Sequence, residues 1–141
     1  MADQKRIAVV PGDGIGPEVI ESGLKVLQAA THKTGAQFEW VMKDWGADKW
    51  LKEGVGLPQG ALDDLTANYE AIYFGALGDP RIPDMAHGRE ILLGMRFGLD
   101  LYVNMRPVQL LAKQFCPIKN KGPDDVNFIV FRENTEDLYV A

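Results

Sequence analysis

Three arginines, Arg96, Arg106 and Arg132, are the residues of this chain best suited to chemistry. They occur in the contexts Gly-Met-Arg96, Asn-Met-Arg106-Pro and Val-Phe-Arg132-Glu, each apolar or turn-forming. Because a guanidinium is costly to desolvate, a buried arginine calls for an anionic partner. Each charge-assisted bond to a bound carboxylate contributes roughly 1.5–3 kcal/mol, so three arginines suit a small substrate with several carboxylates. For any one arginine alone, a surface position with a packed stem is the commoner explanation.

A glycine-rich loop is the second candidate feature. Gly12, Gly14 and Gly16 follow the apolar run 7–10, and Pro17 stands at a natural first position of a helix. Such a helix start presents free N–H groups to an anion or a nucleotide. The spacing is Gly-x-Gly-x-Gly rather than the dinucleotide pattern, and Asp13 would oppose a phosphate. A plain strand-to-helix turn and a ligand-binding loop both remain open.

The remaining candidates are weaker. Tyr139 could donate or relay a proton in a cleft, or it could be a packed aromatic residue. The acidic residues that follow Arg132 could face a cofactor or solvent. His32 and His87 are isolated and show no metal-ligand spacing, and His32 is interpreted as a residue on a helix surface.

Apolar periodicity predicts the elements that position these residues. Short apolar runs predict buried strands, and recurrence at helical spacing predicts helices between them, with Gly35 and Gly54 as helix ends. This alternation favours an α/β fold with a parallel sheet and flanking helices. The expected strands are 7–10, 38–42, 71–74, 101–105 (ending at Pro107) and 126–131; the expected helices are 18–34, 47–53, 57–69 and 90–99; and 75–80, 81–88 and 116–125 are expected to be loops.

Bulk properties exclude several classes of protein. The 141 residues are 46% apolar and 25% charged, with a net charge of −5, which is typical of a soluble globular protein. No basic run indicates a nucleic-acid partner, and no apolar stretch approaches the ~20 residues of a membrane span. The single cysteine, Cys116, excludes an intramolecular disulfide and a thiolate metal cage. Without signal-peptide character at the start, a cytoplasmic location is expected.

The ordered set of motifs resembles the isocitrate/isopropylmalate dehydrogenase family, which comprises β-decarboxylating dehydrogenases of 2-hydroxy acids. The similar segments are 10–19, 96–108 and 132–139, so the resemblance runs along the whole chain. It implies an isopropylmalate dehydrogenase-like fold, in which residues 1–100 form the N-terminal part of the first, cofactor-side domain. Residues 101–141 would begin a second domain that is cut in mid-domain.

The resemblance also implies roles for particular residues. Arg96, Arg106 and Arg132 would bind the malate moiety, and Tyr139 would help to protonate the enol left after decarboxylation. The family uses NAD or NADP together with Mg²⁺ or Mn²⁺, a Lewis acid for hydroxyl and enolate. Its metal-binding aspartates and catalytic lysine would lie beyond residue 141, so no metal ligand is assigned here, and a homodimer is expected of the full-length protein. The cofactor-binding residues implied are Gly12, Asp13, Gly14 and Ile15 at the adenosine end, and Gly75 and Gly78 near the nicotinamide.

The substrate signals conflict. Leu92 and Leu93 could wall an apolar pocket, as in isopropylmalate enzymes, which would place the enzyme in leucine biosynthesis. The segment 132–137, however, is more similar to isocitrate, homoisocitrate and tartrate enzymes, and Arg89 stands where an isopropylmalate enzyme tends to carry an acid. The hypothesis favoured here is 3-isopropylmalate. Isocitrate, homoisocitrate and tartrate remain alternatives, as does a non-catalytic regulatory subunit of an isocitrate-type dehydrogenase.

Overall fold

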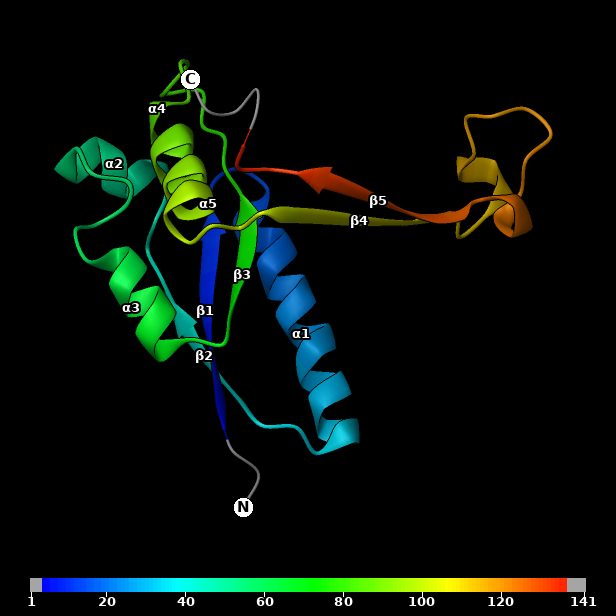
Figure 1. Cartoon of the computed structure of the whole chain (residues 1–141), viewed down its shortest axis with the longest axis horizontal. Helices are drawn as coiled ribbons and strands as arrows, with labels where there is room; N and C mark the ends of the chain where they lie inside the picture. Colours follow the sequence, from blue (N-terminus) through cyan, green and yellow to red (C-terminus); the bar gives the residue numbers. More distant parts are fainter. Residues whose placement is uncertain (1–3, 137–141) are drawn as a thin grey trace. The chain divides into compact units, whose positions relative to one another are not determined.

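The computed structural model describes residues 4–136 (Figure 1). The chain divides into two compact units, Met1–Leu99 and Asp100–Ala141. The first unit contains a parallel sheet with helices on both faces, and the second contains an antiparallel pair of strands.

The sheet of the first unit has three strands in the order β2-β1-β3. They are β1 (Lys5–Gly12), β2 (Phe38–Met42) and β3 (Ala71–Ala76), and β1 pairs in parallel with both neighbours. Ala8, Val9 and Val10 in the central strand are fully buried. A parallel strand covered on both faces is expected to be a continuous apolar run, which is how its sequence predicted it. The α/β prediction with a parallel sheet is therefore confirmed.

Helix α1 (Gly16–Thr34) covers one face of this sheet and contacts β1 and β3 (Figure 1). Pro17 occupies its first turn, and Gly35 ends it in the left-handed conformation with its N–H donated to Thr31 O. The short helix α2 (Ala47–Glu53) ends at Gly54 in the same way. Both helices lie where the sequence predicted them.

Helix α3 (Ala61–Asn68) begins four residues later than the predicted Leu57. Gly60 has a φ of 76°, a left-handed conformation that cannot lie inside a right-handed helix. The N–H of Ala61 instead bonds Pro58 O across a turn. The prediction was wrong for residues 57–60 because Leu57-Pro58 was taken as a helix start rather than as a turn.

The other face of the sheet holds the main core. Ala8 and Val10 point to it, since side chains alternate along a strand, and helices α3 and α5 (Gly94–Gly98) cover it. Its buried members are Ala8, Val10, Trp45, Ala61, Leu65, Ile91 and Met95.

Residues 81–88, predicted to be a loop, contain helix α4 (Ala86–Gly88). The carboxylate of Asp84 accepts the N–H of Ala86 in a turn at the start of this helix, and three helical residues are too few to show an apolar period. The chain continues through a π-helical turn, η1 (Arg89–Leu93), into α5. The predicted helix over 90–99 is thus helical, but its first turn is widened.

The second unit pairs β4 (Val103–Gln109) with β5 (Asn127–Glu133) in antiparallel register. The predicted stop at Pro107 was wrong, because β4 runs through it opposite Ile129. Leu110 donates its N–H to Val126 O, and the alternation of the backbone turns the nitrogen of position 107 away from β5. Proline therefore costs this pair no hydrogen bond.

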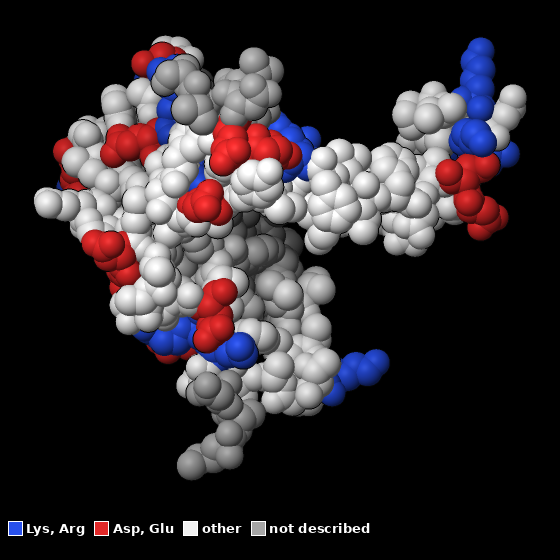
Figure 2. Space-filling model, in the orientation of Figure 1, with Lys and Arg blue, Asp and Glu red and all other residues white. Residues whose placement is uncertain are grey.

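The β4–β5 ribbon carries many exposed apolar side chains. Met105, Phe128 and Phe131 are each more than half exposed. Figure 2 shows the visible face of the ribbon as almost free of charge, with charged side chains gathered at the connecting segment, which contains Lys121 and Asp125. Between the strands lie two short 3₁₀ turns, Lys113–Phe115 and Pro123–Asp125.

Candidate active site

The glycine loop packs closely against the end of β3. The N–H of Asp13 donates to Ala76 O at 2.7 Å. A Cβ atom at Gly12 would lie 2.0 Å from that same oxygen, and one at Gly75 would lie 2.2 Å from Pro11 O. Any larger residue would force the two segments apart. These two glycines therefore permit the close approach of backbone to backbone.

The two loops predicted to bind a cofactor lie side by side at the carboxyl ends of β1 and β3. A Cβ atom at Gly14 would be 3.1 Å from Gly78 O, whereas one at Gly78 would have no heavy atom within 4 Å. Ile15, beside Gly14, is 64% exposed. Ligands of parallel α/β sheets bind at this edge. The uncovered main chain at Gly78 and the exposed apolar side chain of Ile15 would suit the adenosine part of a nucleotide. The cofactor role of these residues stays a prediction.

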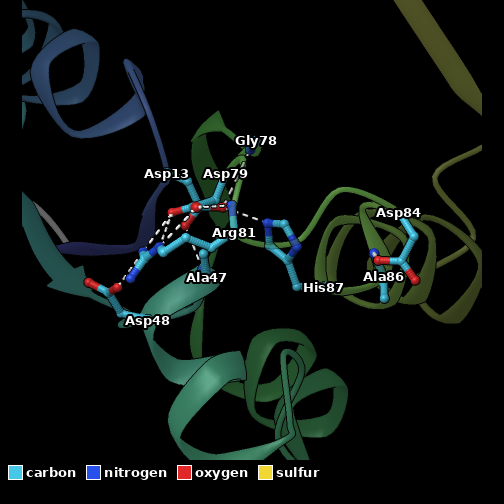
Figure 3. A network of polar contacts seen from close by, with 9 residues as sticks. All are labelled: Asp13, Ala47, Asp48, Gly78, Asp79, Arg81, Asp84, Ala86 and His87. Atoms are coloured by element: carbon cyan, nitrogen blue, oxygen red, sulfur yellow. Dashed lines mark hydrogen bonds and ion pairs between the residues drawn. The ribbon is translucent and has the colours of Figure 1, made fainter.

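Asp13 is buried, and its carboxylate faces into the fold (Figure 3). Oδ1 accepts the N–H of Ala47 at the start of α2. Oδ2 lies 2.8 Å from Nε2 of His87 and 3.4 Å from the N of Gly78. The carboxylate of Asp13 is therefore engaged within the fold, as are its main-chain N–H with Ala76 O and its main-chain O with Gly16 N–H, and its cofactor role stays a prediction.

His87 is the residue that sequence reasoning missed. Its side chain is fully buried and contacts Asp13, 74 positions away along the chain. No spacing pattern links two residues so far apart, and the short helix α4 that carries His87 was itself not predicted. Only the folded arrangement brings the pair together.

A second polar contact fixes the loop that follows β3. The guanidinium of Arg81 bonds both oxygens of Asp79, at 2.6–3.1 Å, and reaches Asp48 of α2 at 2.7 Å (Figure 3). The Arg81 side chain, followed by its main-chain N–H, lowers the pKa of Asp79 to about 2. Asp79 is thus ionised at any ordinary pH and holds the loop by charge.

An apolar pocket of about 460 Å³ lies beside this loop, within the first unit. The helical stretch that begins at Met85 faces the pocket with one side, because its lining residues are spaced four positions apart, as 85, 89 and 93 and as 88 and 92. Ile91 on the other side is fully buried in the core. The predicted pair Leu92 and Leu93 does line an apolar pocket, with Arg89, 64% exposed, beside them. The full lining is Phe74, Gly75, Leu77, Met85, Gly88, Arg89, Leu92 and Leu93.

Glu90 anchors this helical stretch from behind. Its Oε1 accepts the N–H groups of Gly56 and Leu57 at 2.9 and 3.0 Å, and its Oε2 accepts the indole N–H of Trp50 at 3.2 Å. The carboxylate of Glu90 is therefore used within the fold, while Arg89 remains on the pocket side.

The arginines fall in both units. Arg96 is partly buried in α5 of the first unit. In the second unit, Asn104 pairs opposite Arg132, so Arg106, two positions along β4, lies on the same face as Arg132. Arg106 donates through Nε to Asn104 Oδ1 at 2.9 Å. The meeting of Arg96 with the other two stays a prediction, and Tyr139 lies outside the described residues.

A turn follows β5 directly after Arg132. Oε1 of Glu133 accepts the N–H groups of Thr135 and Glu136, and the Thr135 bond is the main cause of a lowered pKa for Glu133. Asn134 is buried and donates to Leu101 O. Glu133 thus stabilises the turn, and Asn134 ties this segment to Leu101, 33 positions earlier.

A parallel sheet flanked by helices, with two glycine-bearing loops at the carboxyl edge of its strands, places the first unit in the class of α/β folds that bind ligands at this edge. The family model of isocitrate/isopropylmalate dehydrogenases matches residues 6–141. The chain belongs to this family of β-decarboxylating dehydrogenases, whose members generally use NAD(P) and a divalent metal ion.

Three relatives illustrate the match. A 3-isopropylmalate dehydrogenase of Thermobifida fusca (strain YX) is 40% identical over 96% of this chain, and a probable tartrate dehydrogenase/decarboxylase of Agrobacterium vitis is 41% identical over 95%. The crystal structure of a β-decarboxylating dehydrogenase of Thermococcus kodakarensis in its apo form superposes with a TM-score of 0.66 and 32% identity, covering 94% of this chain. The chain spans only 38%, 37% and 34% of these proteins, respectively.

Within residues 4–136, no group of three or more His, Cys, Asp or Glu residues is arranged to hold a metal ion. The same range contains no helix long and apolar enough to cross a bilayer.

Proposed function

We propose that this chain is the N-terminal part of an NAD(P)- and metal-dependent dehydrogenase that oxidatively decarboxylates a 2-hydroxy di- or tricarboxylic acid, with 3-isopropylmalate as the preferred substrate. The observation that carries this choice is the apolar pocket lined by Leu92 and Leu93. An isopropyl group is apolar and leaves no polar atom to satisfy, so burying it in such a pocket is favourable.

In this proposal the arginines bind the malate moiety. Arg106 and Arg132, on one face of the β4–β5 ribbon, would grip carboxylates, and Arg96 would join them from α5. Guanidinium forks fix the orientation of a carboxylate and so align C2 for hydride loss. The nicotinamide, when bound, accepts that hydride. Tyr139 would supply a proton to the enol that remains after CO₂ departs.

Two features support a nicotinamide cofactor beside the glycine loop. The adjacent loops at Gly14 and Gly78 leave backbone open, and the exposed Ile15 offers an apolar surface to a nucleoside. The loops lie at the carboxyl edge of the sheet, on the side where the pocket also begins at Gly75. Substrate and cofactor would then share one edge of the first unit.

Arg89 favours a second candidate. Its exposed guanidinium lines the same pocket as Leu92 and Leu93, and its Asp84 partner is distant at 3.9 Å. A substrate with a further carboxylate in place of the isopropyl group would find a cation there. This observation supports isocitrate or homoisocitrate as the alternative, and tartrate remains a candidate by kinship with the Agrobacterium relatives.

The test is a substrate panel with the full-length enzyme. Turnover of 3-isopropylmalate, isocitrate, homoisocitrate and tartrate is measured with Mn²⁺ or Mg²⁺ and with NAD or NADP, following the reduced cofactor by absorbance. We expect kcat/KM to be highest for 3-isopropylmalate. Preference for a tricarboxylate would favour the alternative. No turnover with any combination would indicate the regulatory subunit instead.

A further inference from the structure

The contact between His87 and Asp13 takes no part in the proposed reaction, yet it is the most deeply buried polar contact beside the site. The His87 side chain is 0% exposed and that of Asp13 is 7% exposed. Both oxygens of Asp13 already face main-chain N–H groups, so the carboxylate is the acceptor and Nε2–H of His87 is the donor. Among the described residues, Nδ1 of His87 has no hydrogen-bond partner.

Asp13 links three segments through one side chain and one main-chain group. Its Oδ1 holds the first N–H of α2 at Ala47, and its Oδ2 faces the N–H of Gly78 (Figure 3). Its own N–H is held by Ala76 O. Gly46 permits this approach, because a Cβ atom there would lie 2.6 Å from Oδ1. The carboxylate therefore fixes the glycine loop against the loop that follows β3.

His87 is what keeps that carboxylate in place. Without it, the described partner of Oδ2 would be the N–H of Gly78 at a long 3.4 Å. At 7% exposure, water cannot readily replace the lost donor, and an under-satisfied buried carboxylate is costly. Loss of the His87 donor is therefore expected to loosen the contacts of the Asp13 carboxylate with Gly78 and Ala47.

We propose that His87 is a positioning residue that sets the affinity for the nicotinamide cofactor. It acts through Asp13, holding the loops 12–16 and 75–80 in the mutual arrangement that presents Gly14, Ile15 and Gly78 to the ligand. The cofactor half of this inference rests on the proposed function; the loop-holding half does not.

The loop-holding half is tested on the 141-residue chain by amide hydrogen exchange. His87→Leu keeps the bulk and removes the donor, so exchange at Gly78 and Ala47 is expected to accelerate at least ~10-fold. His87→Gln places an amide N–H near the position of Nε2 and is expected to restore most of the protection. If His87→Leu does not fold, His87→Asn, whose amide is too short to reach Asp13, takes its place. Unchanged exchange at both amides would overturn the inference.

The cofactor half is tested in the full-length enzyme. Binding of NADH and NADPH is measured by their fluorescence, and kinetics are measured alongside. His87→Leu is expected to raise the cofactor Kd and KM at least ~5-fold with a smaller change in the KM of the hydroxy acid, and His87→Gln to stay within ~2-fold of wild type.

The matched control is Leu65→Ala, which removes a buried core side chain of α3 and lies outside the loops 12–16 and 75–80. It is expected to lower the Tm and leave the cofactor Kd within ~2-fold. Equal weakening of cofactor binding by His87→Leu and Leu65→Ala would overturn the inference, because general destabilisation would then explain it. Faster exchange in His87→Leu with no binding of either cofactor by the wild type would support the loop-holding role and overturn the proposed function.

Discussion

Replacing Glu90 by alanine is expected to destabilise the first unit strongly, although the Glu90 side chain is only partly buried. The carboxylate accepts three hydrogen bonds, from the main chain of Gly56 and Leu57 and from the indole of Trp50. A hydrogen bond to a charged group contributes about 1.5–3 kcal/mol at best, and partial exposure reduces each one. We therefore expect Glu90→Ala to lower the free energy of unfolding by about 2–4 kcal/mol.

The assay is urea unfolding of the 141-residue chain, followed by far-UV circular dichroism, because the α-helices of the described residues all lie in the first unit. Glu90→Gln keeps one acceptor oxygen for Gly56 and Leu57 but turns donors toward Trp50, so an intermediate loss of about 1–2 kcal/mol is expected. The matched control is Glu70→Ala, which removes an exposed ion pair to Lys5 and should change stability by no more than ~0.5 kcal/mol.

A loss below ~0.5 kcal/mol for Glu90→Ala would refute the reasoning, since it would show that these three bonds are exchanged for water without cost. An equal loss for Glu70→Ala would refute it as well, because the effect would then follow from charge alone. The outcome also bears on the pocket, because Glu90 belongs to the same π-helical turn as Arg89 and Leu92.

Three further predictions concern the site. In the full-length enzyme, Arg106→Lys should lower kcat/KM by at least ~10-fold, about 1.4 kcal/mol, because a lysine keeps the charge and loses the planar fork; unchanged kinetics would show that Arg106 does not grip the substrate. Gly12→Ala should prevent or strongly weaken folding, seen as a lost or much lower Tm, because its Cβ would collide with Ala76 O at a φ of 72°; a wild-type Tm would contradict this. The pKa of Asp79 falls from 3.8 to about 2 on folding, so its stabilising effect is present above pH ~4 and is lost as the pH falls through about 2. As the pH is lowered from ~4 to about 2, the Tm of the wild type should therefore drop further than the Tm of Asp79→Asn. An equal drop in Tm for the two proteins would contradict a stabilising contact between Asp79 and Arg81.

The sequence predicts those parts of the fold that follow from local chemistry. The apolar run at Ala8–Val10, the period of α1 and the left-handed stop at Gly35 are all encoded within a few neighbouring residues. For Leu92 and Leu93, the resemblance to isopropylmalate enzymes implied an apolar pocket, and both residues line one. The errors arise where a single side chain or backbone angle decides, as Gly60 does at the start of α3 and Asp84 at the start of α4.

The candidate site was less predictable because its polar contacts join distant residues. Asp13 was interpreted as a cofactor-loop residue, yet its carboxylate is engaged by Ala47, Gly78 and His87. A single sequence carries no signal for such a contact, since its members share no periodicity and no motif. The π-helical turn is equally hidden, although it contributes Arg89, Leu92 and Leu93 to the lining of one pocket.

The placement of the tryptophans has a practical consequence. The chain has three, Trp40 in β2, Trp45 in the core and Trp50 bonded to Glu90, and all of them belong to the first unit. Intrinsic fluorescence excited selectively at tryptophan therefore originates in that unit, and none of it originates in the β4–β5 ribbon. If the two units unfold at different denaturant concentrations, emission and a ribbon-specific probe such as a label on Cys116 will give separate transitions, which resolves the two stabilities within one sample.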